Sequence, residues 1–97
     1  MVPALYLDYN VHRMFYVYVI KSEKTLELYY GFSSDLKARI DSHNQGKNIA
    51  TKDGCSWKLI YYEAFKSERD ARKRELKLKK YGDSRTHLKN RLNNSLL

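Results

Sequence analysis

The sequence predicts a small α+β domain whose elements follow the order β-β-α-β-α-α. Three short segments, 15–20, 28–32 and 57–65, are rich in aromatic and β-branched residues, which is typical of strands. Two longer polar segments begin with capping residues and end near a glycine, which is typical of helices. The first two strand segments are joined only by the polar link "KSEKTLE", so they predict a β-hairpin. We therefore expect helices packed on a mostly antiparallel sheet.

The three strand segments differ in their patterns. The segment "FYVYVI" at 15–20 has no charged residue and predicts a strand that is buried on both faces. The segment "LYYGF" at 28–32 predicts a second strand, which Gly31 ends or bends. The segment "WKLIYYEAF" at 57–65 predicts the third strand, after a polar loop at 47–56.

The segment "SSDLKARIDSHNQGK" predicts the first helix. Ser33 or Ser34 is the expected N-cap, and Asp35 then lies in the first turn, where the helix dipole favours a negative charge. Gly46 is the expected stop, because glycine readily adopts the left-handed conformation that ends helices.

Two further helices are expected near the C-terminus. The segment "SERDARKRELKLKKYG" predicts a long helix that Ser67 caps and Gly82 ends. The segment "DSRTHLKNRLNN" predicts a short third helix, capped by Asp83 or Ser84.

Charge distribution points to a polyanionic partner. The chain of 97 residues has a formal net charge of +8 and a sequence pI of about 9.6. Residues 66–91 hold eleven of the 19 Lys and Arg residues but only four of the 11 acidic residues. Such a one-signed helical segment favours phosphate contact over a merely solvated surface. Lys73, Lys77 and Lys80 are the expected nucleic-acid contacts.

Composition also limits the organisation of the chain. Its length suits one compact domain, and we expect residues 1–13 to form an N-terminal arm, 14–82 the domain, and 83–97 a C-terminal helix and tail. Cys55 is the only cysteine, which excludes an internal disulfide and a cysteine-rich zinc site. Without an apolar run of about 20 residues, no membrane span is expected. A cytoplasmic location fits these features.

Glu75 is unusual, because it shares the inward face of its helix. It lies about 40° from Ala71 and about 60° from Leu78 in helical projection. A carboxylate in that position is costly unless it is paired or binds a cation. An ion pair with Arg39 or a lysine and the binding of a metal ion are equally favoured.

Two short motifs and two spacings resemble the GIY-YIG nuclease domain. "YVY" at 16–18 stands in place of Gly-Ile-Tyr, and "YYG" at 29–31 stands in place of Tyr-Ile-Gly. Arg39 matches the key arginine of the next helix, with His43 one turn later. The spacing from an alanine to Glu75 matches the alanine and metal-binding glutamate of the family. The resemblance covers about residues 14–82 and is closest to small stand-alone bacterial members similar to excision-repair endonucleases.

The resemblance implies a three-stranded antiparallel sheet flanked by helices and a metal-dependent endonuclease acting on DNA. One divalent ion, Mg²⁺ or Mn²⁺, is implied at Glu75, and Arg39 would bind the scissile phosphate in two places. Tyr18 or Tyr29 would activate the water, which requires that nearby cations lower the phenol pKa from about 10. His43 would assist proton transfer or bind phosphate, or serve as a structural helix histidine.

The chain departs from the family at several positions. Phe32 replaces the lysine that many members carry after the second motif, and the supporting asparagine has no clear equivalent, with Asn90 a distant candidate. The remaining tyrosines of the strand segments are expected to pack in the core. These are Tyr16, Tyr30, Tyr61 and Tyr62.

Two other functions compete with a nuclease. A non-catalytic nucleic-acid-binding module on the same scaffold is the main alternative, and a basic protein that binds an acidic protein partner is weaker. A single small domain has little surface for reading a long sequence. We therefore expect selection of nucleic-acid structure, linked to repair or recombination, or targeting by a protein partner. The sequence does not distinguish DNA from RNA.

Overall fold

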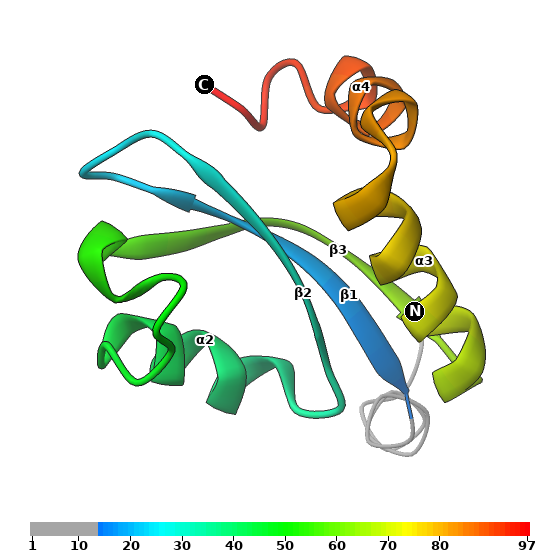
Figure 1. Ribbon diagram of the computed structural model, residues 1–97, viewed down its shortest axis with the longest axis horizontal. Helices are drawn as coiled ribbons and strands as arrows, with labels where there is room; N and C mark the ends of the chain where they lie inside the picture. The colour runs from blue at the N-terminus through cyan, green and yellow to red at the C-terminus, as the bar shows by residue number, and fades with distance from the viewer. Residues whose placement is uncertain (1–13) are drawn as a thin grey trace, which may run out of the picture.

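The computed structural model describes residues 14–97, so the predicted arm at 1–13 lies outside the described residues. Figure 1 shows a curved sheet between one helix on one face and two helices on the other. The elements are β1 (Phe15–Ser22), β2 (Leu28–Ser33), α2 (Leu36–Asn44), the short 3₁₀ helix η1 (Lys52–Gly54), β3 (Trp57–Phe65), α3 (Glu68–Lys80) and α4 (Gly82–Arg91). The predicted α+β fold and the order of its main elements are confirmed.

The sheet has three antiparallel strands in the order β2-β1-β3. In the centre of β1, Tyr18 lies opposite Gly31 of β2 and Tyr62 of β3. β1 continues two residues beyond the predicted 15–20, because Lys21 and Ser22 still pair with the start of β3. The hairpin of β1 and β2 is confirmed.

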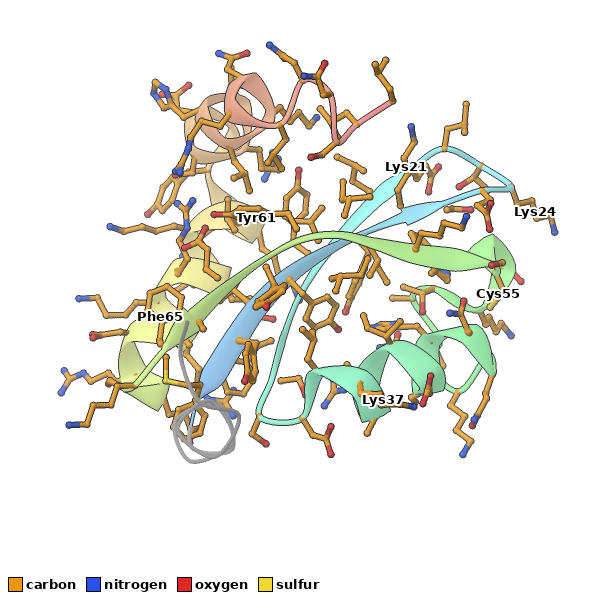
Figure 2. All side chains as sticks on the ribbon, turned by 180° about the vertical axis from the view of Figure 1, so that it is seen from behind. Lys21, Lys24, Lys37, Cys55, Tyr61 and Phe65 are labelled. Atoms are coloured by element: carbon orange, nitrogen blue, oxygen red, sulfur yellow. The ribbon has the colours of Figure 1, made fainter. Side chains whose placement is uncertain are left out.

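Both faces of β1 are buried, as its uniformly apolar sequence predicts. Alternate side chains point to opposite faces of a strand. Val17 and Val19 face α3 and α4, in a cluster that contains Ala71, Leu78, Leu88 and Leu92. Tyr18 and Ile20 face α2, in a cluster that contains Trp57 with Tyr29, Leu36 and Ile40 packed against it. In the reverse view, Tyr61 lies toward α3 and α4, whereas Lys37 lies on α2 (Figure 2).

The start of α2 corrects a predicted cap. Asp35 is the N-cap, and its carboxylate accepts a hydrogen bond from the Ala38 backbone N–H at 3.1 Å. Ser33 is still the last residue of β2, and its hydroxyl binds the backbone of Asp35, so neither Ser33 nor Ser34 caps the helix. The predicted stop is confirmed, since Gly46 follows the helix with a φ of +74°.

The junction of α3 and α4 also differs from expectation. Ser67 caps α3 as predicted, accepting from the Asp70 N–H at 3.3 Å. However, α3 ends at Lys80, and Gly82 begins α4 instead of ending α3. The break is the extended backbone of Tyr81, at φ −116° and ψ 116°.

The predicted N-cap of α4 is not formed, but α4 supplies a contact to the end of α3. The structure shows no side-chain cap from Asp83 or Ser84. Instead, Arg85 Nη1 reaches back and donates to the carbonyl oxygens of Leu78 and Lys79 at 2.7 and 3.1 Å. A cation at the C-terminal end of a helix satisfies its last carbonyl groups, so α4 locks the end of α3.

The expected packing of the strand tyrosines holds for three of the four residues. Tyr16 is buried, and Tyr30 and Tyr61 are half-buried. Tyr62 is 51% exposed, so its assignment to the core was wrong. Helix α2 does not cover β3 here, which leaves a hollow of about 840 Å³ lined by Tyr62 and Leu59 among others.

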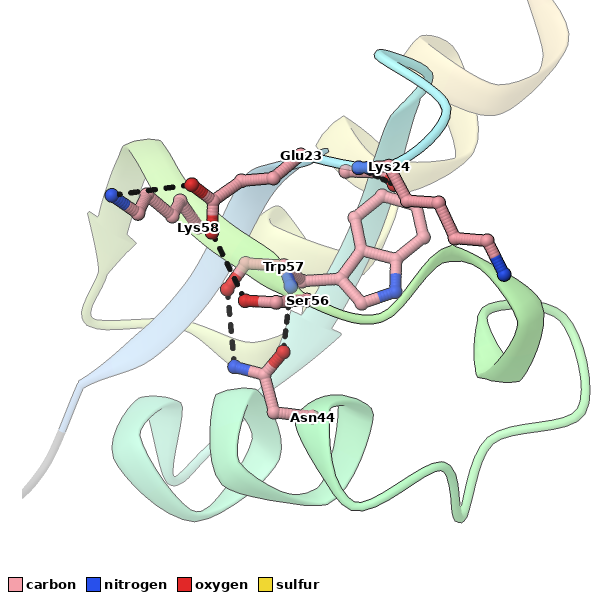
Figure 3. A network of polar contacts seen from close by, with 7 residues as sticks. Glu23, Lys24, Asn44, Ser56, Trp57 and Lys58 are labelled. Atoms are coloured by element: carbon pink, nitrogen blue, oxygen red, sulfur yellow. Dashed lines mark hydrogen bonds and ion pairs between the residues drawn. The ribbon is translucent and has the colours of Figure 1, made fainter.

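Asn44, the last residue of α2, ties this helix to β3 (Figure 3). Its Nδ2 donates to the Trp57 carbonyl oxygen at 3.0 Å, and its Oδ1 accepts from the Trp57 N–H at 2.6 Å. The carboxylate of Glu23 accepts from the Ser56 hydroxyl at 3.1 Å and pairs with Lys58 at 3.5 Å. The side-chain amide of Asn44 thus makes the two hydrogen bonds to the Trp57 backbone that a neighbouring strand would otherwise make.

Asn44→Ala should lower the free energy of unfolding by about 1–2 kcal/mol, because it removes two partly exposed hydrogen bonds to the backbone. In a domain of this size, the melting temperature should fall by roughly 4–15 °C. Asn44→Asp keeps the acceptor and should retain only part of the stability, because its carboxylate opposes the Trp57 carbonyl. Equal melting temperatures for Asn44→Ala and the natural protein would show that this contact is not structural.

Candidate active site

The close approach of Tyr18 to Gly31 defines the centre of the candidate site. The two residues are paired across β1 and β2, and the Tyr18 ring lies directly over the Gly31 backbone. A Cβ atom at Gly31 would fall well inside contact distance of Tyr18 Cζ and Oη. The glycine therefore allows the phenol of a central strand to extend across the edge strand.

His43 holds the hydroxyl group of Tyr18. Both side chains are fully buried, and Tyr18 Oη lies 2.6 Å from His43 Nε2. On the other side of the ring, His43 Nδ1 lies 2.7 Å from Thr51 Oγ1, whose hydroxyl donates to the Asn48 carbonyl. This network assigns the proton to Nδ1 and leaves Nε2 to accept from Tyr18.

Burial and two nearby cations keep His43 neutral. Desolvation lowers the pKa of the imidazole, and the charges of Arg39 and Lys79 lower that pKa further. The Tyr29 ring packs edge-on against the imidazole, with the ring centroids 5.1 Å apart. His43 therefore combines a fixed orientation with an available lone pair at Nε2.

A cavity of about 380 Å³ opens beside the Tyr18 phenol. It receives side chains from β1, β2, α2 and α3, so it joins the two faces of the sheet at its β2 edge. Its lining residues are Tyr18, Tyr29, Phe32, Ser33, Ser34, Arg39, Arg72, Glu75 and Lys79. Four of the five predicted catalytic residues thus line one cavity, and the fifth, His43, binds Tyr18 from behind.

The predicted nucleic-acid contacts lie outside this cavity. Lys73, Lys77 and Lys80 are exposed on α3. Lys73 and Lys77 line another surface hollow together with Asp70 and Arg74. They can contact a polyanion on the helix surface, whereas the cavity holds a separate group of cations.

Glu75 forms an ion pair with Lys79, one helical turn further along α3, at 3.1 Å. Of the two ion pairs that the sequence allowed, the structure thus shows the lysine pair among the described residues. The Glu75 side chain is 21% exposed and that of Lys79 is 43% exposed. The carboxylate is therefore accessible from the cavity.

The cavity offers one carboxylate, that of Glu75, to a divalent cation. No group of three or more His, Cys, Asp or Glu side chains suited to a metal ion occurs within residues 14–97. Mg²⁺ nevertheless binds through one or two carboxylates, with water and substrate phosphate as its other ligands. One accessible carboxylate in a cavity with a mostly polar lining fits this mode, so Glu75 is a suitable protein ligand.

Burial raises the pKa of the Tyr18 phenol above its ordinary value, and electrostatic interaction with the neighbouring Tyr29 phenol adds to this effect. The charge and hydrogen bonding of Arg39 act in the opposite direction but are smaller. The sequence led us to expect cations that lower this pKa, and for Tyr18 that expectation is wrong. The phenol is therefore protonated at neutral pH, and its O–H group donates a hydrogen bond to His43.

Sequence reasoning missed three residues of this site. Lys79 lies 5.2 Å above the Tyr29 ring, and the Arg72 guanidinium lies 4.1 Å from the centroid of the Phe32 ring. The spacing of Lys79 from Glu75 offered a signal for an i,i+4 pair. Nothing in the sequence singled out Arg72, or Thr51 in its polar loop.

Comparison with known proteins agrees with this geometry. The sequence profile of the GIY-YIG catalytic domain matches residues 14–93. A UPF0213 protein from Clostridium perfringens is 40% identical over 68 residues, which cover 69% of this chain and 72% of that protein. A UPF0213 protein from Staphylococcus haemolyticus is 39% identical over 67 residues, which cover 68% of this chain and 80% of that protein.

Two further findings are negative. No solved structure matches the chain. None of the helices within residues 14–97 has the length and apolar character needed to cross a membrane. The profile match spans most of the sequence and includes every residue of the cavity, so the chain belongs to the GIY-YIG family.

Proposed function

We propose that this protein is a metal-dependent endonuclease that hydrolyses phosphodiester bonds in DNA. The observation that carries the proposal is the cavity shared by Tyr18, Tyr29, Arg39 and Glu75, with the Tyr18 hydroxyl bound to His43. Membership in a nuclease family implies a nucleic-acid substrate. The cavity supplies a proton acceptor, a phosphate-binding cation and a metal-binding carboxylate, which this hydrolysis requires.

Tyr18 and His43 act together as the base. The Tyr18 phenol passes its proton to His43 Nε2, and its oxygen takes a proton from the attacking water. As the oxygen of that water bonds to phosphorus, the bond between phosphorus and the leaving sugar oxygen breaks, and the leaving oxygen takes up a proton from solvent. His43 becomes an imidazolium, and Thr51 Oγ1 still accepts from Nδ1. The short contact of 2.6 Å between Tyr18 and His43 allows this transfer without movement of either ring.

Arg39 binds the scissile phosphate. It lies on the exposed surface of α2 and lines the cavity on the Tyr18 side. A guanidinium can donate two parallel hydrogen bonds to phosphate oxygens, which fixes the orientation of the phosphate for attack.

Glu75 would hold the divalent cation, which we propose is Mg²⁺ or Mn²⁺. GIY-YIG nucleases generally depend on a divalent metal. When bound, the ion neutralises phosphate charge and stabilises the leaving oxygen. Lys79 supplies the positive charge that pairs with Glu75 in the structure.

The exposed lysines of α3 supply binding that does not depend on sequence. Lys73, Lys77 and Lys80 would contact phosphates next to the site. The proposal includes selection of nucleic-acid structure, a role in repair or recombination, a cytoplasmic location and targeting by a protein partner. The small size of the domain and its single cysteine support these finer points.

Cleavage of supercoiled plasmid DNA tests the proposal directly. The natural protein should nick or cut the plasmid with Mg²⁺ or Mn²⁺, and EDTA should stop the reaction. Glu75→Gln should abolish cleavage and weaken Mn²⁺ binding, while its melting temperature stays nearly unchanged. The i,i+4 pair with Lys79 is partly exposed, and helix pairs of this kind contribute only about 0.3–0.5 kcal/mol.

Glu23→Gln is the matched control for Glu75→Gln. Glu23 also pairs with a lysine, Lys58, but it lies on the loop after β1, away from the cavity. Equal cleavage by the Glu23 and Glu75 variants would rule out Glu75 as the metal ligand. DNA binding without any cleavage by the natural protein would instead support a non-catalytic module.

Tyr18→Phe should reduce the rate of cleavage by a factor of about 10² or more, because the base loses its hydroxyl. Tyr29→Phe should cause a smaller loss, because its ring still packs against His43. The measurement is the single-turnover rate of each variant on the same DNA. The two variants are matched, because each loses one hydroxyl group from the same cavity. A larger loss in Tyr29→Phe would assign the base to Tyr29.

The lowered pKa of His43 predicts a pH-dependent stability. Since the folded pKa lies below the unfolded value of about 6.5, the unfolded chain binds more protons in this range. The stability from neutral His43 is therefore complete above about pH 6.5 and decreases as the pH falls toward the folded pKa.

Thermal melts between neutral and mildly acidic pH check this expectation. The natural protein should lose stability as the pH falls below about 6.5, and His43→Gln should show a smaller decrease. Glutamine can still accept from Tyr18 but does not titrate. Parallel curves for the two proteins would contradict a buried neutral His43.

A further inference from the structure

Arg72 belongs to two surface hollows at once. It lines the active-site cavity with Arg39, Glu75 and Lys79. It also lines a second hollow of about 500 Å³ on α3, with Glu68, Arg69, Lys73 and Leu76. Each hollow holds three cationic side chains and one carboxylate, so the positive surface continues through Arg72 from the cavity onto the helix.

Two contacts orient the Arg72 guanidinium. Its central carbon lies 4.1 Å from the centroid of the Phe32 ring, and its Nε donates to Glu68 Oε2 at 2.7 Å. Within residues 14–97, its two terminal amino groups make no hydrogen bond to the protein. A guanidinium has four N–H bonds on those two groups, and here they are available to a planar anion.

The neighbouring Arg74 shows a different arrangement. Its Nε donates to both carboxylate oxygens of Glu63, at 3.1 and 3.0 Å, and its Nη2 lies 2.9 Å from Oε2. Only 25% of its side chain is exposed. Arg74 therefore joins α3 to β3. By contrast, 58% of the Arg72 side chain is exposed, and its terminal amino groups do not connect α3 to another element.

We propose that Arg72, held on the Phe32 ring, binds the phosphate adjacent to the one at Arg39 and leads the nucleic-acid strand out of the cavity. The strand then continues over the second hollow, where Arg69 and Lys73 contact later phosphates. Leu76, which is 55% exposed, lies in the same hollow and provides an apolar contact for a sugar or base. This assignment rests on the proposed nucleic-acid substrate. It adds the path of the strand over the protein and a binding point for one of its phosphates.

A structural role for Arg72 has weaker support. Its contact with Glu68 is an exposed i,i+4 ion pair, a type that contributes little to stability. The Phe32 ring already packs against the core cluster of Val17 and Val19 and stacks on Phe15 with ring centroids 6.3 Å apart. The ring therefore does not need Arg72 to cover it, and it provides a fixed support for the guanidinium.

Metal-free DNA binding tests the inference. The probe is a short fluorescein-labelled DNA duplex, with EDTA present, and anisotropy is measured over a series of salt concentrations. Arg72→Ala should weaken binding about tenfold at low salt and lower the slope of log K against log salt by about one. Lys58→Ala is the control, because it also removes one cation from an exposed ion pair but lies outside both hollows.

Two conservative variants test how Arg72 is held. Arg72→Lys should keep most of the salt slope but recover only part of the affinity, because lysine lacks the planar fork. Phe32→Leu keeps an apolar side chain but removes the ring, and it should weaken binding by about threefold, as expected for an exposed cation–π contact. Thermal melts confirm that each variant is folded before binding is compared.

The outcomes separate this inference from the nuclease proposal. Equal affinity and slope for Arg72→Ala and Lys58→Ala would overturn it, whether or not the natural protein cleaves DNA. Full recovery of affinity by Arg72→Lys would overturn the part played by the planar guanidinium, and full affinity in Phe32→Leu would overturn the part played by the Phe32 ring. A selective loss in Arg72→Ala supports the inference even if cleavage is never observed, because the measurement contains no metal ion and needs no reaction.

Discussion

The missing side chain at Gly31 is the constraint on which the site depends. Tyr18 comes from the central strand, and its ring can reach the cavity only by lying across the backbone of the edge strand β2. Helices α2 and α3 lie on opposite faces of the sheet, and their functional side chains meet at this same edge. A larger residue at Gly31 would displace the phenol from His43 and from the cavity together, since interiors are too closely packed to absorb an additional methyl group at this distance.

The Tyr18–His43 pair brings two buried, neutral groups into hydrogen-bond contact. Burial raises the pKa of the phenol and lowers the pKa of the imidazole, so each group is held in its uncharged form. A phenol alone in such surroundings would be a poor base. In the proposed mechanism, the contact of 2.6 Å with Nε2 makes the phenol one half of a base whose second half would carry the positive charge. The cations near the phenols would then serve the substrate more than the tyrosine.

Much of the fold could be predicted from local sequence, because its signals are local. The aromatic and β-branched runs form the strands, Ser67 caps α3, and Gly46 follows α2 in the left-handed conformation. The errors arise where a competing contact overrides the expected one: the backbone of Asp35 occupies the Ser33 hydroxyl, and Arg85 caps α3 from the next helix. The two motifs predicted Tyr18 and Tyr29, and helical periodicity predicted Glu75. Thr51 and Arg72 could not be found in this way, because Thr51 lies in a polar loop with no motif and Arg72 contacts Phe32, which lies on a different element.

Helix α2 is fastened at both of its ends. At the N-terminal end, the Ser33 hydroxyl binds the cap residue Asp35, and at the C-terminal end the Asn44 amide binds the backbone of Trp57. The first attachment lies on β2 and the second on β3, so the helix spans the sheet from one edge strand to the other. Arg39 and His43 lie between these two attachments, so the backbone that carries them is tied to both edge strands. In the proposed mechanism, part of the loss of freedom needed to align a phosphate-binding cation with a proton acceptor would then be met when the chain folds, before the substrate binds.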